Sequence, residues 1–227
     1  MIEYLHFHKR RSTVLLALLT ALSVCCNGDA LAQTTTGEVK CANLIYARNK
    51  TSVCFSSDFM DDINNKTNIR TDGKFSPVRL EDENLFDYPF SVMTGEGNFK
   101  LSQSQQESLK NYLTGGGFVV ASAGCSDGSW ASSCRKELNG LFPENKMKKL
   151  EMDHPIFHSF YDIKRLNSAR KDLEGLEIDG KIVLVFSSDG LNDSDNAEDE
   201  SCCCCGGNEI DNARQININL LIYALTH

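Results

Sequence analysis

Ile182-Val183-Leu184-Val185-Phe186 is the stretch of sequence that decides the fold, because all five of its residues are apolar. A strand with one face in water alternates apolar and polar residues, whereas a strand covered on both faces reads as a continuous apolar run. Such runs are typical of parallel sheets that carry helices on both sides. The segment therefore predicts a fully buried strand in an α/β protein.

Strand-like and helix-like segments alternate on either side of this run. Apolar-rich stretches predict strands at 39–46, 75–80, 88–94, 118–121 and 150–152. Helical spacing and capping residues predict helices at 57–68, 102–113, 129–141 and 208–224. This alternation favours a single doubly wound, mainly parallel sheet with helices on both faces.

Local signals place the ends of several elements. Ser102 and Gln105 have the spacing of a capping box, in which each side chain bonds the backbone of the other, so a helix should begin at this point. The glycines at 115–117 should end that helix. Asp72-Gly73 is typical of a turn.

The first 32 residues have the three parts of a secretory signal peptide. Lys9, Arg10 and Arg11 precede an uncharged, mostly apolar run at 12–26, and Ala30-Leu31-Ala32 offers a cleavage site. We expect cleavage after Ala32, a loose stub at 33–38 and one domain at 39–227, exported to the periplasm or secreted. One alternative is an uncleaved anchor helix, although the apolar run is shorter than the roughly 20 residues of a membrane span. A second is a lipoprotein, because Cys25 and Cys26 end the apolar run, although Val24 is bulkier than the small residue that such processing prefers.

The charge of the chain argues against nucleic acid as a partner. The sequence has 23 basic and 31 acidic residues, and loss of three basic and two acidic residues with the signal peptide would change the net charge from −8 to −9. Nucleic-acid binding requires clustered Lys and Arg. No later apolar run reaches spanning length, so the mature chain is expected to be soluble and not to span a membrane.

Eight of the ten cysteines lie beyond residue 32, and an exported chain permits disulfides. Neighbouring cysteines pair with each other only under strain. The tract Cys202-Cys203-Cys204-Cys205 could therefore pair with distant cysteines or hold a soft metal as thiolates. A thiol-handling or metal-handling protein built on this tract is one hypothesis for function.

Three loops follow expected strands and should meet at one edge of the sheet, where ligands bind in open α/β sheets. Six of their residues are candidates for ligand binding, and the list is Thr94, Gly95, Gly97, Asp127, Trp130 and Asp189. Tight turns at the glycines and a core position for the single tryptophan are the structural alternatives.

Cys125 is a candidate nucleophile, because it lies between an expected buried strand and an expected helix, where nucleophile elbows occur. A helix N-terminus favours the thiolate. With His154 as base and Glu96 or Asp127 as orienting carboxylate, it would form a cysteine-hydrolase constellation. The G-x-C-x-G pattern is incomplete, and an ordinary buried or disulfide-bonded cysteine is the alternative.

Asp153, His154 and His158 form a second candidate site. Pro155 suits the first turn of a short helix, which would place the two histidines near one face. Two imidazoles and a carboxylate can ligate a divalent metal such as zinc. The alternative is structural, with Asp153 capping the helix and the histidines in ordinary hydrogen bonds.

Several blocks of the sequence resemble the bacterial DUF4159 family. They are Tyr88-Pro89-Phe90, Met93-Thr94-Gly95, Gly115-Gly116-Gly117-Phe118, Asp153-His154-Pro155-Ile156-Phe157-His158-Ser159-Phe160-Tyr161, Glu177-Ile178-Asp179-Gly180, and the ending that starts at Asn217 and closes with Tyr223-Ala224-Leu225-Thr226-His227. The resemblance implies a flavodoxin-like fold related to class I glutamine amidotransferase-like domains. It implies no activity, because none is established for the family. Gly124-Cys125-Ser126 departs from the family pattern, which weakens the case for a shared nucleophile.

Three hypotheses for function follow. The first is a domain that binds a ligand or a protein partner at the strand-end edge, and it leaves enzymatic activity open. The second is a metal-dependent or cysteine-dependent hydrolase, and the third is the cysteine-tract protein.

Overall fold

The run that contains Ile182 forms strand β7, Lys181–Ser187, inside a seven-stranded sheet. A computed structural model describes residues 37–48, 50, 55–167, 172–192 and 210–227. The expected signal peptide, Cys54 and the tract 202–205 lie outside these residues.

The strand order in the sheet is β2-β1-β3-β4-β7-β6-β5. The first five strands in this order are parallel. At the β7 side, β6 pairs antiparallel with β7, and β5 pairs antiparallel with β6. The remaining strands are β1 Val39–Ile45, β2 Thr71–Arg79, β3 Phe90–Gly95, β4 Phe118–Ala123, β5 Lys148–Lys149 and β6 Glu174–Ile178. The helices are α1 Asp58–Lys66, α2 Gln103–Thr114, α3 Gly128–Leu141 and α4 Ala213–Thr226, with short 3₁₀ turns η1 Glu83–Asp87, η2 Gly124–Ser126 and η3 Pro155–Phe157.

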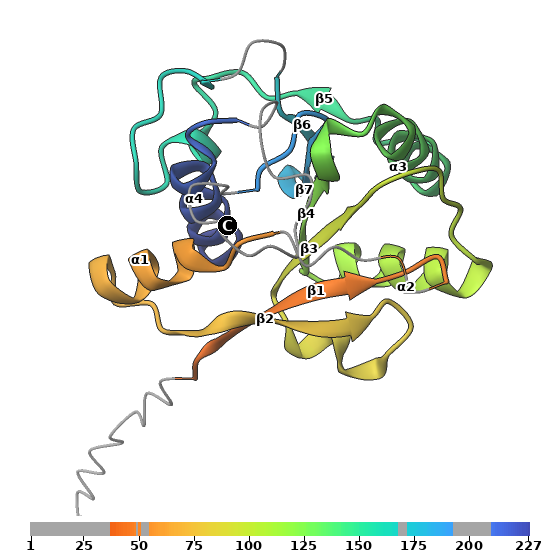
Figure 1. The fold of residues 1–227 in the computed structure, drawn as a ribbon, viewed down its shortest axis with the longest axis horizontal. Coiled ribbons are helices and arrows are strands. Elements are labelled where there is room, and N and C mark those ends of the chain that lie inside the picture. Colours follow the sequence, from red (N-terminus) through yellow and green to blue (C-terminus); the bar gives the residue numbers. More distant parts are fainter. Residues whose placement is uncertain (1–36, 49, 51–54, 168–171, 193–209) are drawn as a thin grey trace, which may run out of the picture. The chain divides into compact units, whose positions relative to one another are not determined.

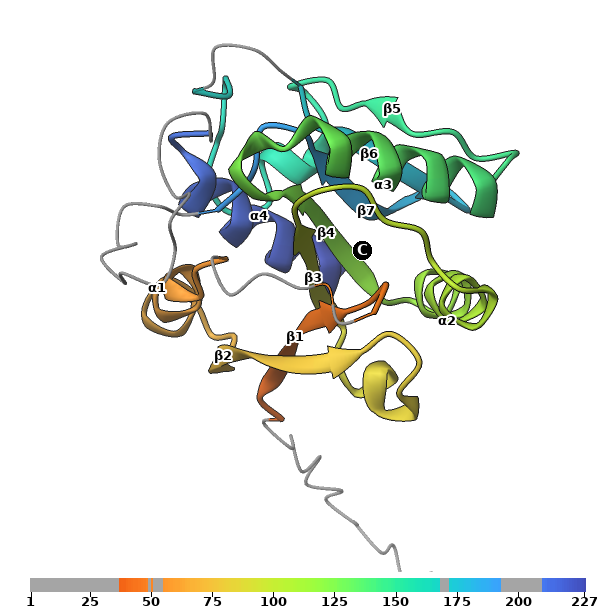
Figure 2. The same ribbon diagram turned by 45° about the vertical axis from the view of Figure 1, so that its right-hand side comes forward.

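Helices cover both faces of the sheet, with α1 and α4 on one side and α2 and α3 on the other (Figures 1 and 2). The side chains of β4 alternate between the two resulting cores: Val120 packs with α1 and α4, whereas Val119 and Ala121 pack with α2 and α3. All six residues of β4 are buried. The fold is thus the predicted doubly wound, mainly parallel α/β sheet of the flavodoxin-like kind.

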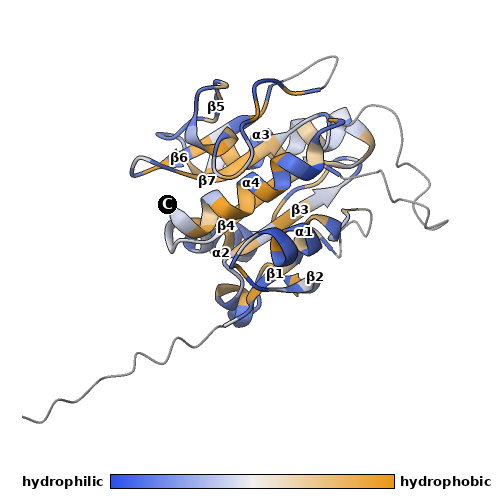
Figure 3. Ribbon diagram, turned by 90° about the vertical axis from the view of Figure 1, so that its left-hand side faces the viewer, coloured by the Kyte–Doolittle hydropathy of each residue, from blue (hydrophilic) through white to orange (hydrophobic). Residues whose placement is uncertain are grey.

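Hydropathy follows the depth of each element (Figure 3). Strand β4 is mainly apolar, whereas α1 has a mostly hydrophilic surface and buries only Phe59, Met60 and Ile63. Helix α4 is buried along most of its length and is apolar around most of its circumference, as expected of a helix inside the molecule. No helix in the described part of the chain is both long enough and apolar enough to cross a membrane.

Most of the expected elements are present, and the capping box of α2 is confirmed in both directions between Ser102 and Gln105. The turn expected at Asp72-Gly73 is instead a bulge inside β2. The pairing with β1 shifts there from Val39 with Thr71 to Cys41 with Phe75, and Gly73 takes a φ of +69°.

Three boundaries also differ from expectation. Residues 150–152 are not a strand. The two-residue strand β5 lies just before them, at Lys148–Lys149, and it pairs with β6, a strand that was not predicted from the sequence. Helix α4 begins at Ala213, five residues later than expected. Helix α3 begins at Gly128, because Asp127 caps it by accepting a hydrogen bond from the Trp130 amide at 2.7 Å.

Candidate functional site

The three expected loops come together at the carboxyl ends of β3, β4 and β7, which are neighbours in the sheet. The Ser126 hydroxyl donates to the carbonyl of Asp189 at 2.7 Å and joins the β4 and β7 loops. The Cys125 thiol donates to Oε1 of Glu96 at 3.1 Å and joins the β4 and β3 loops. We call this carboxyl edge of the sheet, with its loops, the rim.

Cys125 lies on a left-handed turn, η2, between β4 and α3. Its φ and ψ are 49° and 30°, and Ser126 follows with a φ of 54°. Two successive non-glycine residues in this region cost about 1–3 kcal/mol each, so the surrounding structure must hold them there. Gly124 makes the turn compact, because a Cβ on it would lie 3.0 Å from the Gly95 carbonyl oxygen. The turn holds a partly exposed thiol at the rim.

Glu96 is exposed, and its carboxylate is placed to accept the thiol proton of Cys125. The ammonium group of Lys50 donates to the Glu96 backbone carbonyl and fixes the loop from the β1 side. A carboxylate within hydrogen-bond distance of a thiol is the minimum requirement for general-base activation of a nucleophile. The structure thus brings two of the three expected catalytic residues together.

The third, His154, is not brought to this pair. Its ring packs against Tyr223 with 5.8 Å between ring centroids, and the Tyr223 hydroxyl accepts from the amide of Ile182, at the amino-terminal end of β7. Cys125 follows the carboxyl end of β4, and β4 and β7 are parallel. Cys125 therefore lies at the carboxyl ends of the parallel strands, whereas His154 lies at their amino ends.

His154 has a structural role at that edge. Its Nδ1 accepts a hydrogen bond from the Ile156 amide at 3.2 Å, so His154, rather than Asp153, caps η3. Desolvation of the ring, the largest influence, lowers its pKa. The lowered pKa favours the neutral ring, which is the form that can accept this bond at Nδ1.

The expected metal site is not assembled from Asp153, His154 and His158. Because η3 is a single 3₁₀ turn, the two histidines do not share a helix face. His158 contacts Asp162 Oδ1 through Nδ1 at 2.6 Å and the Met152 carbonyl through Nε2 at 2.8 Å. Among the residues that the structure describes, no group of three His, Cys, Asp or Glu side chains is placed to hold a metal ion.

Trp130 supports the rim from below and is fully buried, so no ligand can stack on it in this structure. Its indole Nε1 donates to the hydroxyl of Tyr46, which in turn donates to the carbonyl of Thr94 at 2.8 Å. Burial is the main reason that the pKa of Tyr46 is raised, so this hydroxyl keeps its proton. Gly95 passes over the pair, and a Cβ on it would lie 2.7 Å from the Tyr46 hydroxyl oxygen.

The other expected ligand-binding residues divide between support and exposure. Thr94 and Asp189 are buried, and the Asp127 carboxylate caps α3. Gly97 is partly exposed beside Lys50, with a φ of +68°. The structure therefore gives most of these residues supporting roles. Gly97 and Asp127 are partly exposed, as is the neighbouring Cys125, and Glu96 is exposed.

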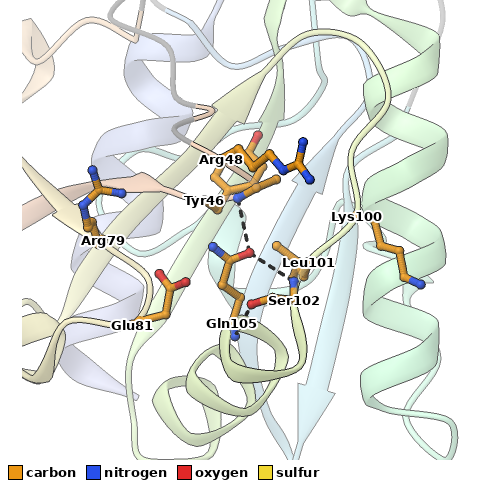
Figure 4. Close-up of a pocket in the computed structure, with 9 residues that line it drawn as sticks. Tyr46, Arg48, Arg79, Glu81, Lys100, Leu101, Ser102 and Gln105 are labelled. Atoms are coloured by element: carbon orange, nitrogen blue, oxygen red, sulfur yellow. Dashed lines mark hydrogen bonds between the residues drawn. The ribbon is translucent and has the colours of Figure 1, made fainter.

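A pocket of about 420 Å³ (Figure 4) includes Tyr46, the residue whose hydroxyl bonds the Thr94 carbonyl. It lies where β1 and β2 end and α2 begins, and it is lined by Tyr46, Ala47, Arg48, Arg79, Glu81, Lys100, Leu101, Ser102 and Gln105. None of these residues was predicted as part of a site from the sequence. A usable signal was present, because a basic residue ends or closely follows each of two parallel strands, Arg48 after β1 and Arg79 at the end of β2.

The turn after β1 is fixed by hydrogen bonds on both sides. Tyr46 and Lys50 exchange two backbone bonds of 3.0 and 2.6 Å, and the Ala47 amide donates to Oε1 of Gln105 at 3.2 Å. Ala47 and Arg48 both have positive φ angles, 40° and 62°. The turn places Arg48 at the pocket. It directly follows Tyr46, whose hydroxyl bonds the Thr94 carbonyl just before the Glu96 loop.

The profile of a family described as a domain of unknown function, DUF4159, matches residues 40–225. The match runs from the second residue of β1 to the next-to-last residue of α4 and includes every residue of the rim named above. A search of curated proteins finds no match.

Proposed function

The chain belongs to the DUF4159 family, whose description assigns no activity, so we infer its function from its own residues. We propose that it is an exported domain that binds a small polar ligand in the pocket at the ends of β1 and β2. The pocket is the observation that carries this proposal. Ligands of doubly wound sheets bind outside the carboxyl ends of the strands, where the strand order reverses. Here the order reverses between β1 and β3, next to the pocket.

The size and lining of the pocket support a small polar ligand. A volume of about 420 Å³ falls within the range of small-molecule sites. Its wall includes four charged side chains, Arg48, Arg79, Glu81 and Lys100, and one buried amide, Gln105. Export is supported by the basic, apolar and small-residue pattern of residues 1–32.

Titration of the purified protein with a metabolite panel, followed by two-dimensional NMR, tests the binding proposal. The panel contains sugars, amino acids, polyamines, carboxylates, nucleosides and sugar phosphates. We expect at least one compound to shift the amide signals of Ala47, Ser102 and Gln105 together, because their backbone surrounds the pocket. The amides of Ile156 and Phe157, at the other edge of the sheet, serve as the internal control. Absence of any rim response to the whole panel would refute the proposal.

Cysteine-dependent chemistry is a second candidate, favoured by the Cys125–Glu96 contact on the left-handed turn. In this reaction the Cys125 sulfur would bond to the carbonyl carbon of an ester or amide. Glu96 would accept the thiol proton and deliver it to the leaving group, and water would then hydrolyse the thioester. This candidate needs only residues that the structure already brings together.

Alkylation of the native protein tests whether Cys125 is the reactive thiol. After mild reduction, iodoacetamide should label Cys125 at least about tenfold faster than Cys41 and Cys134. Those two thiols are buried, and burial raises the pKa of each. Peptide mapping by mass spectrometry gives the three rates in one sample. Equal or slower labelling of Cys125 would exclude it as an accessible nucleophile.

Hydrolysis of an activated ester then tests the role of Glu96. If the carboxylate is the base, E96Q should slow hydrolysis by about 10²–10⁴-fold while the protein stays folded. D127N is not a suitable control, since Asp127 caps α3. E83Q, which changes an exposed carboxylate on η1, is the matched control and should leave the rate unchanged.

A further inference from the structure

The side chain of Gln105 presents an unused hydrogen-bond donor to the pocket. Gln105 is 7% exposed, and its Oε1 accepts from the amides of Ala47 and Ser102, both at 3.2 Å. Two N–H donors at one atom identify that atom as the oxygen, so the amide orientation is fixed. The nitrogen, Nε2, points away from them toward the side of the pocket where Glu81 lies (Figure 4). No residue in the described part of the chain accepts a hydrogen bond from Nε2.

The charges around this donor favour an anion. Arg48, Arg79 and Lys100 line the pocket, and Glu81 is the only acidic residue among the described residues that line it. This three-to-one excess of basic residues occurs in a chain whose net charge is −8. In the described part of the chain, neither Arg48 nor Lys100 forms an ion pair. The pocket is therefore a local reversal of the overall charge.

Helix α2 adds to this positive charge, because its N-cap Ser102 and its first-turn residue Gln105 both line the pocket. The N-terminus of a helix carries unpaired N–H groups and a partial positive charge. No acidic residue occupies the first turn of α2 to offset it. A helix end of this kind stabilises phosphate or carboxylate groups when other donors converge on the same position.

We infer that the ligand of this pocket carries an oxyanion, a phosphate or a carboxylate, bound by Gln105 Nε2 and the start of α2 and facing Arg48 and Arg79. This inference rests on the proposed binding function and names the chemistry of its ligand. A single phosphate is much smaller than about 420 Å³, so the pocket has room for more of the molecule. Glu81 is placed to accept a hydroxyl or amine donor from that remainder.

The substitution Gln105→Glu separates the donor from the fold. Glutamate keeps an oxygen for the amides of Ala47 and Ser102, and it is also the usual partner of serine in a capping box, so α2 should remain intact. It replaces the Nε2 donor in the pocket with a negative oxygen. Gln103→Glu is the matched control: it makes the same change at the same helix end, at an exposed residue outside the pocket.

Calorimetric titration with inorganic phosphate and with succinate, at constant ionic strength, tests the inference. We expect saturable binding of at least one probe, weakened about tenfold or more by Q105E and less than about threefold by Q103E. Binding of phosphate alone identifies a phosphate ligand, and binding of succinate alone identifies a carboxylate.

Two outcomes would overturn the inference. The first is that neither probe binds. The second is that Q105E and Q103E weaken binding equally, because equal losses would indicate a long-range charge effect rather than a hydrogen-bond donor at the site. The metabolite panel distinguishes failure of the inference from failure of the binding proposal. A neutral or cationic compound that shifts the pocket amides would preserve binding and reject the oxyanion.

Discussion

Replacing Trp130 with alanine should lower the free energy of unfolding by about 3–5 kcal/mol, the usual cost of removing a large buried aromatic side chain. The indole is fully buried between the sheet and α3 and stacks on Phe186, with ring centroids 6.4 Å apart. It also contacts Phe99 at 5.7 Å. Its loss leaves a cavity directly beneath the rim and removes the donor to the Tyr46 hydroxyl.

Equilibrium unfolding in guanidinium chloride, followed by far-ultraviolet circular dichroism, measures this change. Phe86→Ala is the matched control, because Phe86 is an aromatic residue with 58% of its surface exposed. It should cost less than about 1 kcal/mol. A loss below about 1 kcal/mol for W130A would mean that the rim does not depend on this core.

The fold was largely predictable because its central strands have a simple apolar pattern. Ile182–Phe186 and the buried strand β4 could only be covered on both faces, and the capping box of α2 marked a helix start. Strand β6 was missed because Glu174–Ile178 contains two glutamates and a glycine in five residues. Its place depends on antiparallel pairing with β7, which is a tertiary contact rather than a local pattern.

The rim was predicted only in part, for a related reason. The rule that parallel strands end at one edge correctly brought Glu96 and Cys125 together. It could not place His154, because the sequence does not show toward which edge η3 folds back.

The pocket was missed because its charged residues come from distant positions in the sequence that no local motif connects. Arg48, Arg79 and Lys100 become neighbours only when β1, β2 and α2 assemble. Gln105 was recognised as a helix cap. Its second contact, to the Ala47 amide 58 residues away, is what orients Nε2 toward the pocket.

Trp130, Tyr46 and Gly95 form the support that connects both parts of the rim. Tyr46 lines the pocket, and its hydroxyl donates a hydrogen bond to the carbonyl of Thr94 near the end of β3. The chain continues directly through Gly95 to Glu96, the partner of Cys125. A change at Gly95 should therefore disturb stability and the thiol–carboxylate contact together.

Replacing Gly95 with alanine should lower the free energy of unfolding by about 1–3 kcal/mol, the usual cost of overpacking a core. The added Cβ would lie 2.7 Å from the Tyr46 hydroxyl and 3.0 Å from Trp130 Nε1. Neither atom can easily withdraw, because both side chains are buried and bonded to each other. The backbone of Gly95 must shift instead, and it carries Glu96 away from Cys125.

Chemical denaturation and the iodoacetamide rate of Cys125 measure the two effects on one sample. Gly128→Ala is the control: Gly128 is exposed at the first residue of α3, and no atom lies within 4 Å of its added Cβ. It should change stability by less than about 0.5 kcal/mol and leave the labelling rate as it is. If G95A loses stability but Cys125 reacts as in the parent protein, the support acts on the fold alone. If neither quantity changes, the close packing of Gly95 against Tyr46 and Trp130 is refuted.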